Sequence, residues 1–81
     1  MNVHTHHYTA LVRALAQDAA RVEATLSEME LRLAHVPPRP VKEDADVAAW
    51  RDRVQALRTL LYGLHVSLAV RREETREGGA A

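Results

Sequence analysis

Residues 33–50 read LAHVPPRPVKEDADVAAW, and this stretch decides the fold because its prolines interrupt an otherwise continuous helical pattern. Pro37 disfavours the helical conformation in the residue before it, and Pro40 suits the first position of a new helix. Glu43 and the acidic residues beside it follow in what would be the opening turns of that helix, where the helix dipole favours negative charge. The stretch therefore predicts a helix, a turn over residues 37–40, and a second helix.

Apolar residues on both sides of the turn recur with alternating gaps of four and three, which is the period of about 3.5 that is typical of coiled coils. The predicted fold is all-α: an antiparallel two-helix hairpin, coiled-coil-like, with helices over about 5–36 and 41–76 and a flexible tail over 77–81. Trp50, the single tryptophan, is expected to anchor the core. The repeating positions are Tyr8, Val12, Leu15, Ala19, Val22, Leu26, Met29, Leu33 and Val36 before the turn, and Val47, Trp50, Val54, Leu57, Leu61, Leu64 and Leu68 after it.

Two alignments of the helices are compatible with this pattern. In the first register Leu26 lies opposite Trp50, and in the second, one heptad away, Leu33 lies opposite Trp50. A three-residue turn favours the first register and a longer loop favours the second. We expect the first.

The chain has 81 residues and no cysteine, so we expect a single helical-hairpin domain over 1–81 that no disulfide stabilises. A hairpin of this size buries little surface, and self-association is a common source of additional stability in such small chains. The sequence therefore predicts a homodimer in which two hairpins form a four-helix bundle.

A line of mostly small residues runs beside the main apolar positions of the second helix and includes Gly63, which costs about 1 kcal/mol relative to alanine within a helix. Small side chains allow another helix to approach closely, so we expect Gly63→Leu to weaken the dimer more than it lowers helix content. The predicted dimer interface consists of Leu11, Ala16, Ala20, Ala56, Leu60, Gly63, Leu64, Ser67 and Val70.

Histidines are the main candidates for metal chemistry. His4, His6 and His7 cluster near the N-terminus, but no carboxylate lies nearby, and a solvated terminus explains them better than a metal site. His65 is expected to be partly buried and hydrogen-bonded, with a pH-sensitive interface as the alternative. We find no phosphate-binding glycine loop, no catalytic triad order and no Glu-x-x-His motif of di-iron bundles, so we expect no cofactor, no metal and no enzymatic activity.

Arginines flank the apolar positions of the second helix. Glu23 and Glu30 flank those of the first helix, so ion pairs between the helices are expected with Arg51, Arg58 and Arg72. The alternative is that a small regulator contacts nucleic acid through Arg51, Arg53, Arg58, Arg71 and Arg72. Acidic neighbours and the lack of interleaved aromatic residues argue against that alternative.

The formal net charge is zero, which does not suggest a general polyanion binder. The sequence contains no segment of the length and apolarity of a membrane span and no signal-peptide pattern, so we expect a cytoplasmic protein. The predicted function is a non-enzymatic protein–protein interaction or assembly module, a small homodimeric adaptor or accessory subunit that binds itself and another protein. A bundle enzyme or metal binder is the third possibility.

Overall fold

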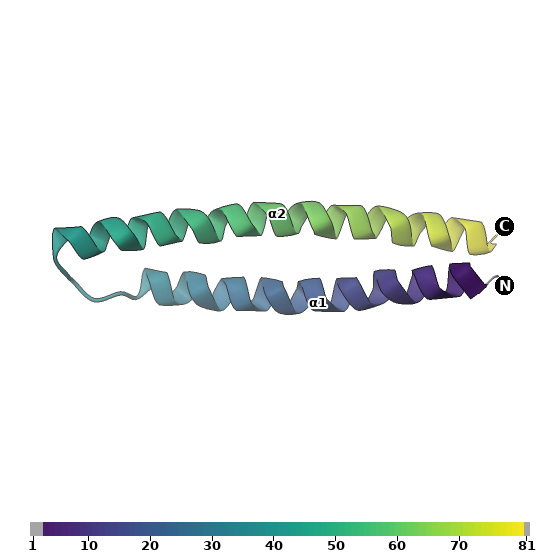
Figure 1. Cartoon of the computed structure of the whole chain (residues 1–81), viewed down its shortest axis with the longest axis horizontal. Coiled ribbons are helices and arrows are strands. Elements are labelled where there is room, and N and C mark those ends of the chain that lie inside the picture. Colours follow the sequence, from purple (N-terminus) through teal and green to yellow (C-terminus); the bar gives the residue numbers. More distant parts are fainter. Residues whose placement is uncertain (1–2, 81) are drawn as a thin grey trace.

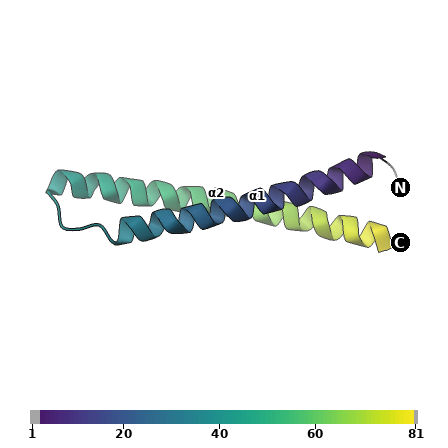
Figure 2. The same ribbon diagram turned by 90° about the horizontal axis from the view of Figure 1, so that it is seen from below.

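The structure, a computed structural model, describes the backbone of residues 3–80 and the side chains of residues 6–74. Helix α1 (Val3–Ala34) and helix α2 (Val41–Ala80) run antiparallel and are joined at one end by residues 35–40. Figure 1 shows both chain termini at the opposite end of the rod, and Figure 2 shows that the helices cross at a shallow angle. The hairpin measures 61 × 16 × 15 Å, so the predicted all-α hairpin is confirmed.

The turn occupies residues 35–40 rather than 37–40 because α1 ends before His35. The backbone N–H of His35 donates to the Leu31 carbonyl at 3.1 Å, and His35 Nδ1 lies 2.8 Å from the same oxygen. At the start of α2 the backbone N–H of Asp44 donates to the Pro40 carbonyl at 3.1 Å. The Asp44 carboxylate also lies 3.0 Å from Arg39 Nε, and this ion pair connects the turn to the beginning of α2.

The outer ends of both helices extend beyond the predicted bounds. α1 begins at Val3 rather than about residue 5, and α2 continues through Gly78 and Gly79 to Ala80 instead of ending near residue 76. Glycine lowers helix propensity without preventing the helical conformation, so a glycine pair does not by itself end a helix.

The core is a single line of residues from each helix. We label the seven positions of the heptad a to g, so that the residues of these two lines occupy position a. These residues are only 2% (Ala19) to 9% (Leu61) exposed. The buried residues at position a are Val12, Ala19 and Leu26 in α1 and Val47, Val54, Leu61 and Leu68 in α2. No described side chain is less than 2% exposed, because each helix has only one neighbour.

The second set of heptad residues, at position d, is not buried. Tyr8, Leu15, Val22, Trp50, Leu57 and Leu64 retain between 38% (Leu15) and 54% (Trp50) of their exposure. The expectation that both heptad positions, and Trp50 in particular, fill the core of the hairpin is therefore wrong for the single chain. Position e lies on the side of position a that is opposite to position d. The surfaces by which the two helices face each other are centred between positions a and e.

The helices adopt the second register. Arg51 Nη2 donates to the Leu33 carbonyl at 2.9 Å, so Leu33 lies level with the adjacent Trp50. The first register, which we expected, is wrong because the connection over residues 35–40 is long enough for α2 to start beyond the end of α1 (Figure 1).

Candidate interaction surface

One side of the hairpin is closed by charged residues at position e. Arg58 Nε donates to Glu30 Oε1 at 2.7 Å, and Arg58 Nη2 donates to both Glu30 and Ser27. Arg58 Nη1 also lies 3.8 Å from Glu23 Oε1. The predicted ion pairing of Glu23 and Glu30 with Arg58 is confirmed, and it ties together the centres of both helices.

Two further contacts extend this charged side. Arg51, which we expected to form an ion pair, donates instead to the Leu33 carbonyl near the end of α1. His65 Nε2 lies 3.4 Å from Glu23 Oε2 but makes no hydrogen bond, although the predicted partial burial of this histidine is confirmed. These contacts therefore run from the turn to the middle of the rod.

The opposite side of the hairpin is apolar. Residues three and four positions after a buried residue lie on opposite flanks of it, because each residue turns the helix by about 100°. The position e residues of the two helices contact each other, so the position d residues of both helices must emerge together on the other flank. We call this surface the open face; it consists of Tyr8, Leu15, Val22 and the half-buried Met29 of α1, Val36 of the turn, and Trp50, Leu57 and Leu64 of α2.

Two shallow depressions support this assignment of the sides. One is lined by Ser27, Glu30, Leu31, Ala34, Arg51 and Gln55, and belongs to the charged side. The other lies at the turn end, where Leu33, Val36, Val47 and Trp50 supply its apolar lining and Arg32, Arg39, Glu43 and Asp46 supply charged groups. Since Val36 and Trp50 also belong to the open face, that face ends in a depression beside the turn.

The predicted dimer interface is distributed over three sides of the hairpin. Leu64 lies on the open face, and Leu11, Leu60 and Ser67, at position g, border it. Ala16 and Ala20 lie on the charged flank of α1, since Ala16 shares position e with Glu23. Ala56, Gly63 and Val70 lie on the outer side of α2. The heptad repeat in the sequence identifies the position d residues of the open face as apolar positions. Our prediction from the sequence, however, placed them in contacts between the two helices of one chain.

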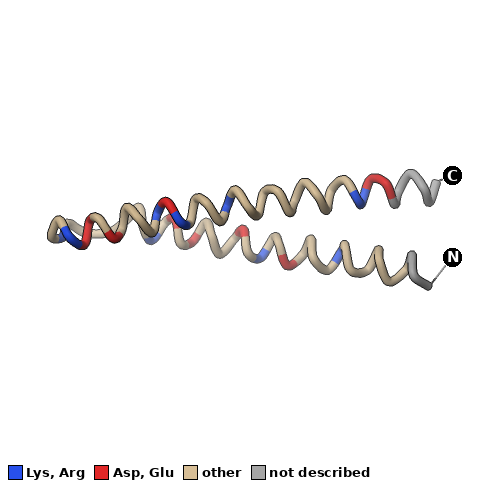
Figure 3. The backbone as a smooth tube through the Cα atoms, turned by 45° about the horizontal axis from the view of Figure 1, so that its top comes forward, with Lys and Arg blue, Asp and Glu red and all other residues tan. Residues whose placement is uncertain are grey.

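α2 carries a further apolar stretch. From Thr59 to Val70 it contains no Asp, Glu, Lys or Arg, and Figure 3 shows this segment as a long uncoloured part of the tube. Leu60 and Tyr62 are among its most exposed residues. A Cβ atom added at Gly63 would meet nothing within 4 Å, so the hairpin itself does not require a glycine there.

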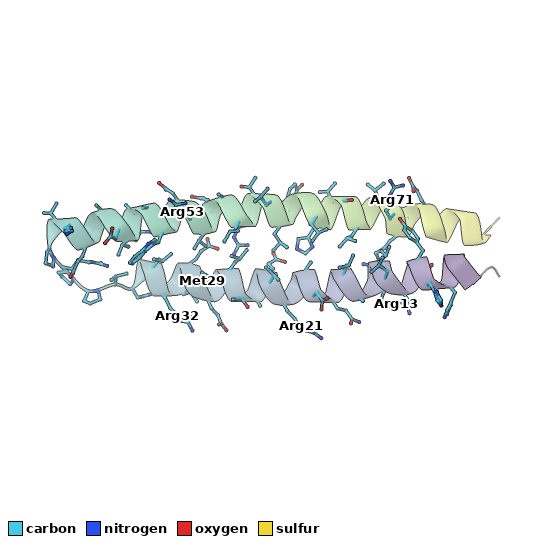
Figure 4. All side chains as sticks on the ribbon, viewed as in Figure 1. Arg13, Arg21, Met29, Arg32, Arg53 and Arg71 are labelled. Atoms are coloured by element: carbon cyan, nitrogen blue, oxygen red, sulfur yellow. The ribbon has the colours of Figure 1, made fainter. Side chains whose placement is uncertain are left out.

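The arginines considered for nucleic acid contact do not form one patch. Arg51 and Arg58 bind partners in α1, and Arg71 donates to Glu74 at 2.9 Å. The Glu74 hydrogen bond, together with its charge, raises the pKa of Arg71 above its ordinary value. Arg53 points away from α1 on the outer side of α2 (Figure 4).

The described part of the chain contains neither a metal-binding cluster nor a helix that could cross a membrane. Among the side chains of residues 6–74, no three histidine, cysteine or carboxylate groups gather as they would around a metal ion. The rings of His6 and His7 lie 6.4 Å apart, and the side chain of His4 lies outside the described residues. Neither helix, over its described length, is apolar enough for long enough to cross a membrane.

Comparison of the chain with protein-family models, with curated proteins and with solved structures finds no match.

Proposed function

We propose that this chain is a non-enzymatic assembly module whose open face packs against a second copy to form a four-helix bundle. The observation that carries the proposal is that both helices direct a half-exposed line of large apolar side chains to the same side of the hairpin. In a bundle these position d residues would complete the heptad core that position a begins within each chain.

The extent of the open face supports this proposal. Isolated exposed apolar residues are ordinary in soluble proteins, but large contiguous apolar patches are uncommon on monomers and mark interaction sites. The open face follows the heptad repeat from Tyr8 to the turn, and the hairpin alone has only a thin core. A second hairpin supplies apolar surface of the same length and spacing.

The alternative of nucleic acid binding has weaker support. Phosphate contacts require several basic side chains directed to one surface, and Arg51, Arg58 and Arg71 have acceptors within the chain. Docking of a different protein is a further use of α2, where Leu60 and Tyr62 are exposed.

Sedimentation equilibrium of the Leu57→Glu variant tests the proposal. Leu57 is 49% exposed in the hairpin, so a glutamate there leaves the single chain folded but places a charge in the proposed dimer core. We expect the unsubstituted chain to be dimeric and the variant monomeric, with helix content retained by circular dichroism.

Leu31→Glu is the matched control. Leu31 is 60% exposed and borders the charged side rather than the open face, so the same substitution should leave the dimer intact. A monomeric unsubstituted chain would refute the proposal, as would a Leu57→Glu variant that dimerises as tightly as the control.

A further inference from the structure

The core of the hairpin contains no group that fixes the position of one helix along the other. A buried polar residue commonly fixes the register of a coiled coil, because it must meet a polar partner. Among the described residues no polar or charged residue is buried, and the buried line of each helix is apolar throughout. Since these residues recur every seven positions, a slide of one heptad would again bring apolar residues together.

The charged side of the hairpin is compatible with the same slide. Arg58 lies between two glutamates one heptad apart, with its Nε 2.7 Å from Glu30 Oε1 and its Nη1 3.8 Å from Glu23 Oε1. If α2 moved by one heptad towards the chain termini, Arg58 would lie beside Glu23, and Arg51 would take its place beside Glu30. Both arginines would then have a carboxylate partner.

The turn is long enough for both positions of α2. A slide of one heptad moves α2 by about 10 Å, since each residue of a helix advances by about 1.5 Å. In the structure α2 starts beyond the end of α1 (Figure 1), so the slide would bring these two ends level. Residues 35–40 would then cross only the distance between adjacent helices, about 8–10 Å, which is well within their extended length of about 20 Å.

We propose that the hairpin has two registers one heptad apart, the observed one and the one in which Leu26 lies opposite Trp50. Each residue of the open face on α2 would move by one heptad along α1, so the two registers present different surfaces to a partner. The slide takes place within one chain, so it does not depend on the proposed dimer.

Two features hold the unsubstituted chain in the observed register. His65 Nε2 lies 3.4 Å from Glu23 Oε2, whereas in the second register His65 would lie beside Ala16. Leu26 is 4% exposed in the core, and the slide would put the smaller Ala19 in its place and leave a cavity. Changing residues 65 and 19 should therefore change the preferred register.

The variant that tests the proposal combines His65→Glu with Ala19→Leu. In the observed register the new glutamate would lie against Glu23 and repel it, and the new leucine would overfill a site where Ala19 is only 2% exposed. In the second register the glutamate would lie beside Ala16 and the leucine would occupy the site of Leu26. The variant should therefore adopt the second register.

The distance between two spin labels within one chain reports the register. Because the chain has no cysteine, Ala10→Cys and Ala49→Cys give one exposed label site on each helix, the first near the termini and the second near the turn. We expect the distance between the labels to shorten by about 10 Å in the combined variant. A large excess of unlabelled chain in the sample ensures that only distances within one chain are measured.

Ala56→Glu in the labelled chain is the control, because Ala56 is exposed on the outer side of α2 and the same charge there meets no carboxylate of α1. Its label distance should equal that of the otherwise unsubstituted chain. An unchanged distance in the combined variant would overturn the proposal. Loss of helix content in that variant, measured by circular dichroism, would overturn it as well, because the second register would then fail to hold the chain.

Discussion

Leu61 and Leu64 offer a comparison of two identical substitutions on one turn of α2. Leu61 is 9% exposed and belongs to the core of the hairpin, whereas Leu64 is 41% exposed and belongs to the open face. Replacing either with alanine removes the same atoms. Any difference in outcome therefore reports on which surface each side chain covers.

The magnitudes follow from burial. Complete burial of a leucine side chain contributes about 1.5–3 kcal/mol. Assembly would cover the 41% of Leu64 that the hairpin leaves exposed, which corresponds to about 0.6–1.2 kcal/mol for each copy. Over the two chains of a dimer, Leu64→Ala should weaken association by about 1–2.5 kcal/mol, or about 5-fold to 60-fold in the dissociation constant.

Leu61→Ala acts on the single chain instead. Leucine-to-alanine changes in protein cores cost about 2–5 kcal/mol, and we expect the lower end of that range because this core is only one residue deep. The free energy of unfolding should fall at every protein concentration, including those at which the dimer has dissociated.

Thermal unfolding by circular dichroism over a series of protein concentrations, with sedimentation equilibrium of the folded species, separates the two effects. Leu64→Ala should lower the melting temperature mainly where the unsubstituted chain is dimeric. The reasoning would be refuted if Leu64→Ala left the dissociation constant unchanged, or if it destabilised the dilute monomer as much as Leu61→Ala does.

Three further predictions concern other parts of the hairpin. Arg58→Ala should lower the free energy of unfolding by about 1 kcal/mol, with a smaller effect in high salt, because the ion pairs of Arg58 with Glu23 and Glu30 are partly exposed. The control is Arg21→Ala, because the partner of Arg21, Asp18, lies on the same exposed helix surface. Urea denaturation in which Arg58→Ala lost no more stability than Arg21→Ala would contradict this prediction. Gly63→Ala should stabilise the chain by about 1 kcal/mol, since the added methyl group meets open space. Loss of the dimer in Gly63→Leu, measured by light scattering, would move the interface to the outer side of α2 and away from the open face. The fluorescence of Trp50 should shift to shorter wavelength as the protein concentration rises through the dimer dissociation constant, and emission independent of concentration in a dimerising sample would place this indole outside the interface.

The sequence predicted the helices and the position of the turn because these depend on local signals. Pro37 and Pro40 restrict the backbone directly, and a period of about 3.5 residues identifies an apolar side for each helix. The pairing of Glu23 and Glu30 with Arg58 was also predictable, since these residues flank the heptad positions of facing helices.

The register and the use of the two heptad positions were not predictable to the same degree. α1 ends at Ala34 because Pro37 and Pro38 have no backbone N–H to donate to the carbonyls of Leu33 and Ala34. The connection is therefore longer than three residues, and α2 lies one heptad further along α1 than we expected. A heptad pattern states which residues avoid water but not whether the neighbouring helix belongs to the same chain. Val22 and Leu64 therefore look the same in sequence as Leu26 and Leu61.

The order in which the buried residues meet along the rod has a consequence for folding. Leu33 and Val47 are separated by little more than the turn, whereas Val12 and Leu68, near the other end, are separated by most of the chain. Because short loops close at the lowest entropic cost, the hairpin should fold as a zipper that starts at the prolines and proceeds towards the termini. Transient opening should then be most frequent at the terminal end, where proteases would cut first, and shortening both helices from that end should reduce stability in steps of one heptad without abolishing the fold.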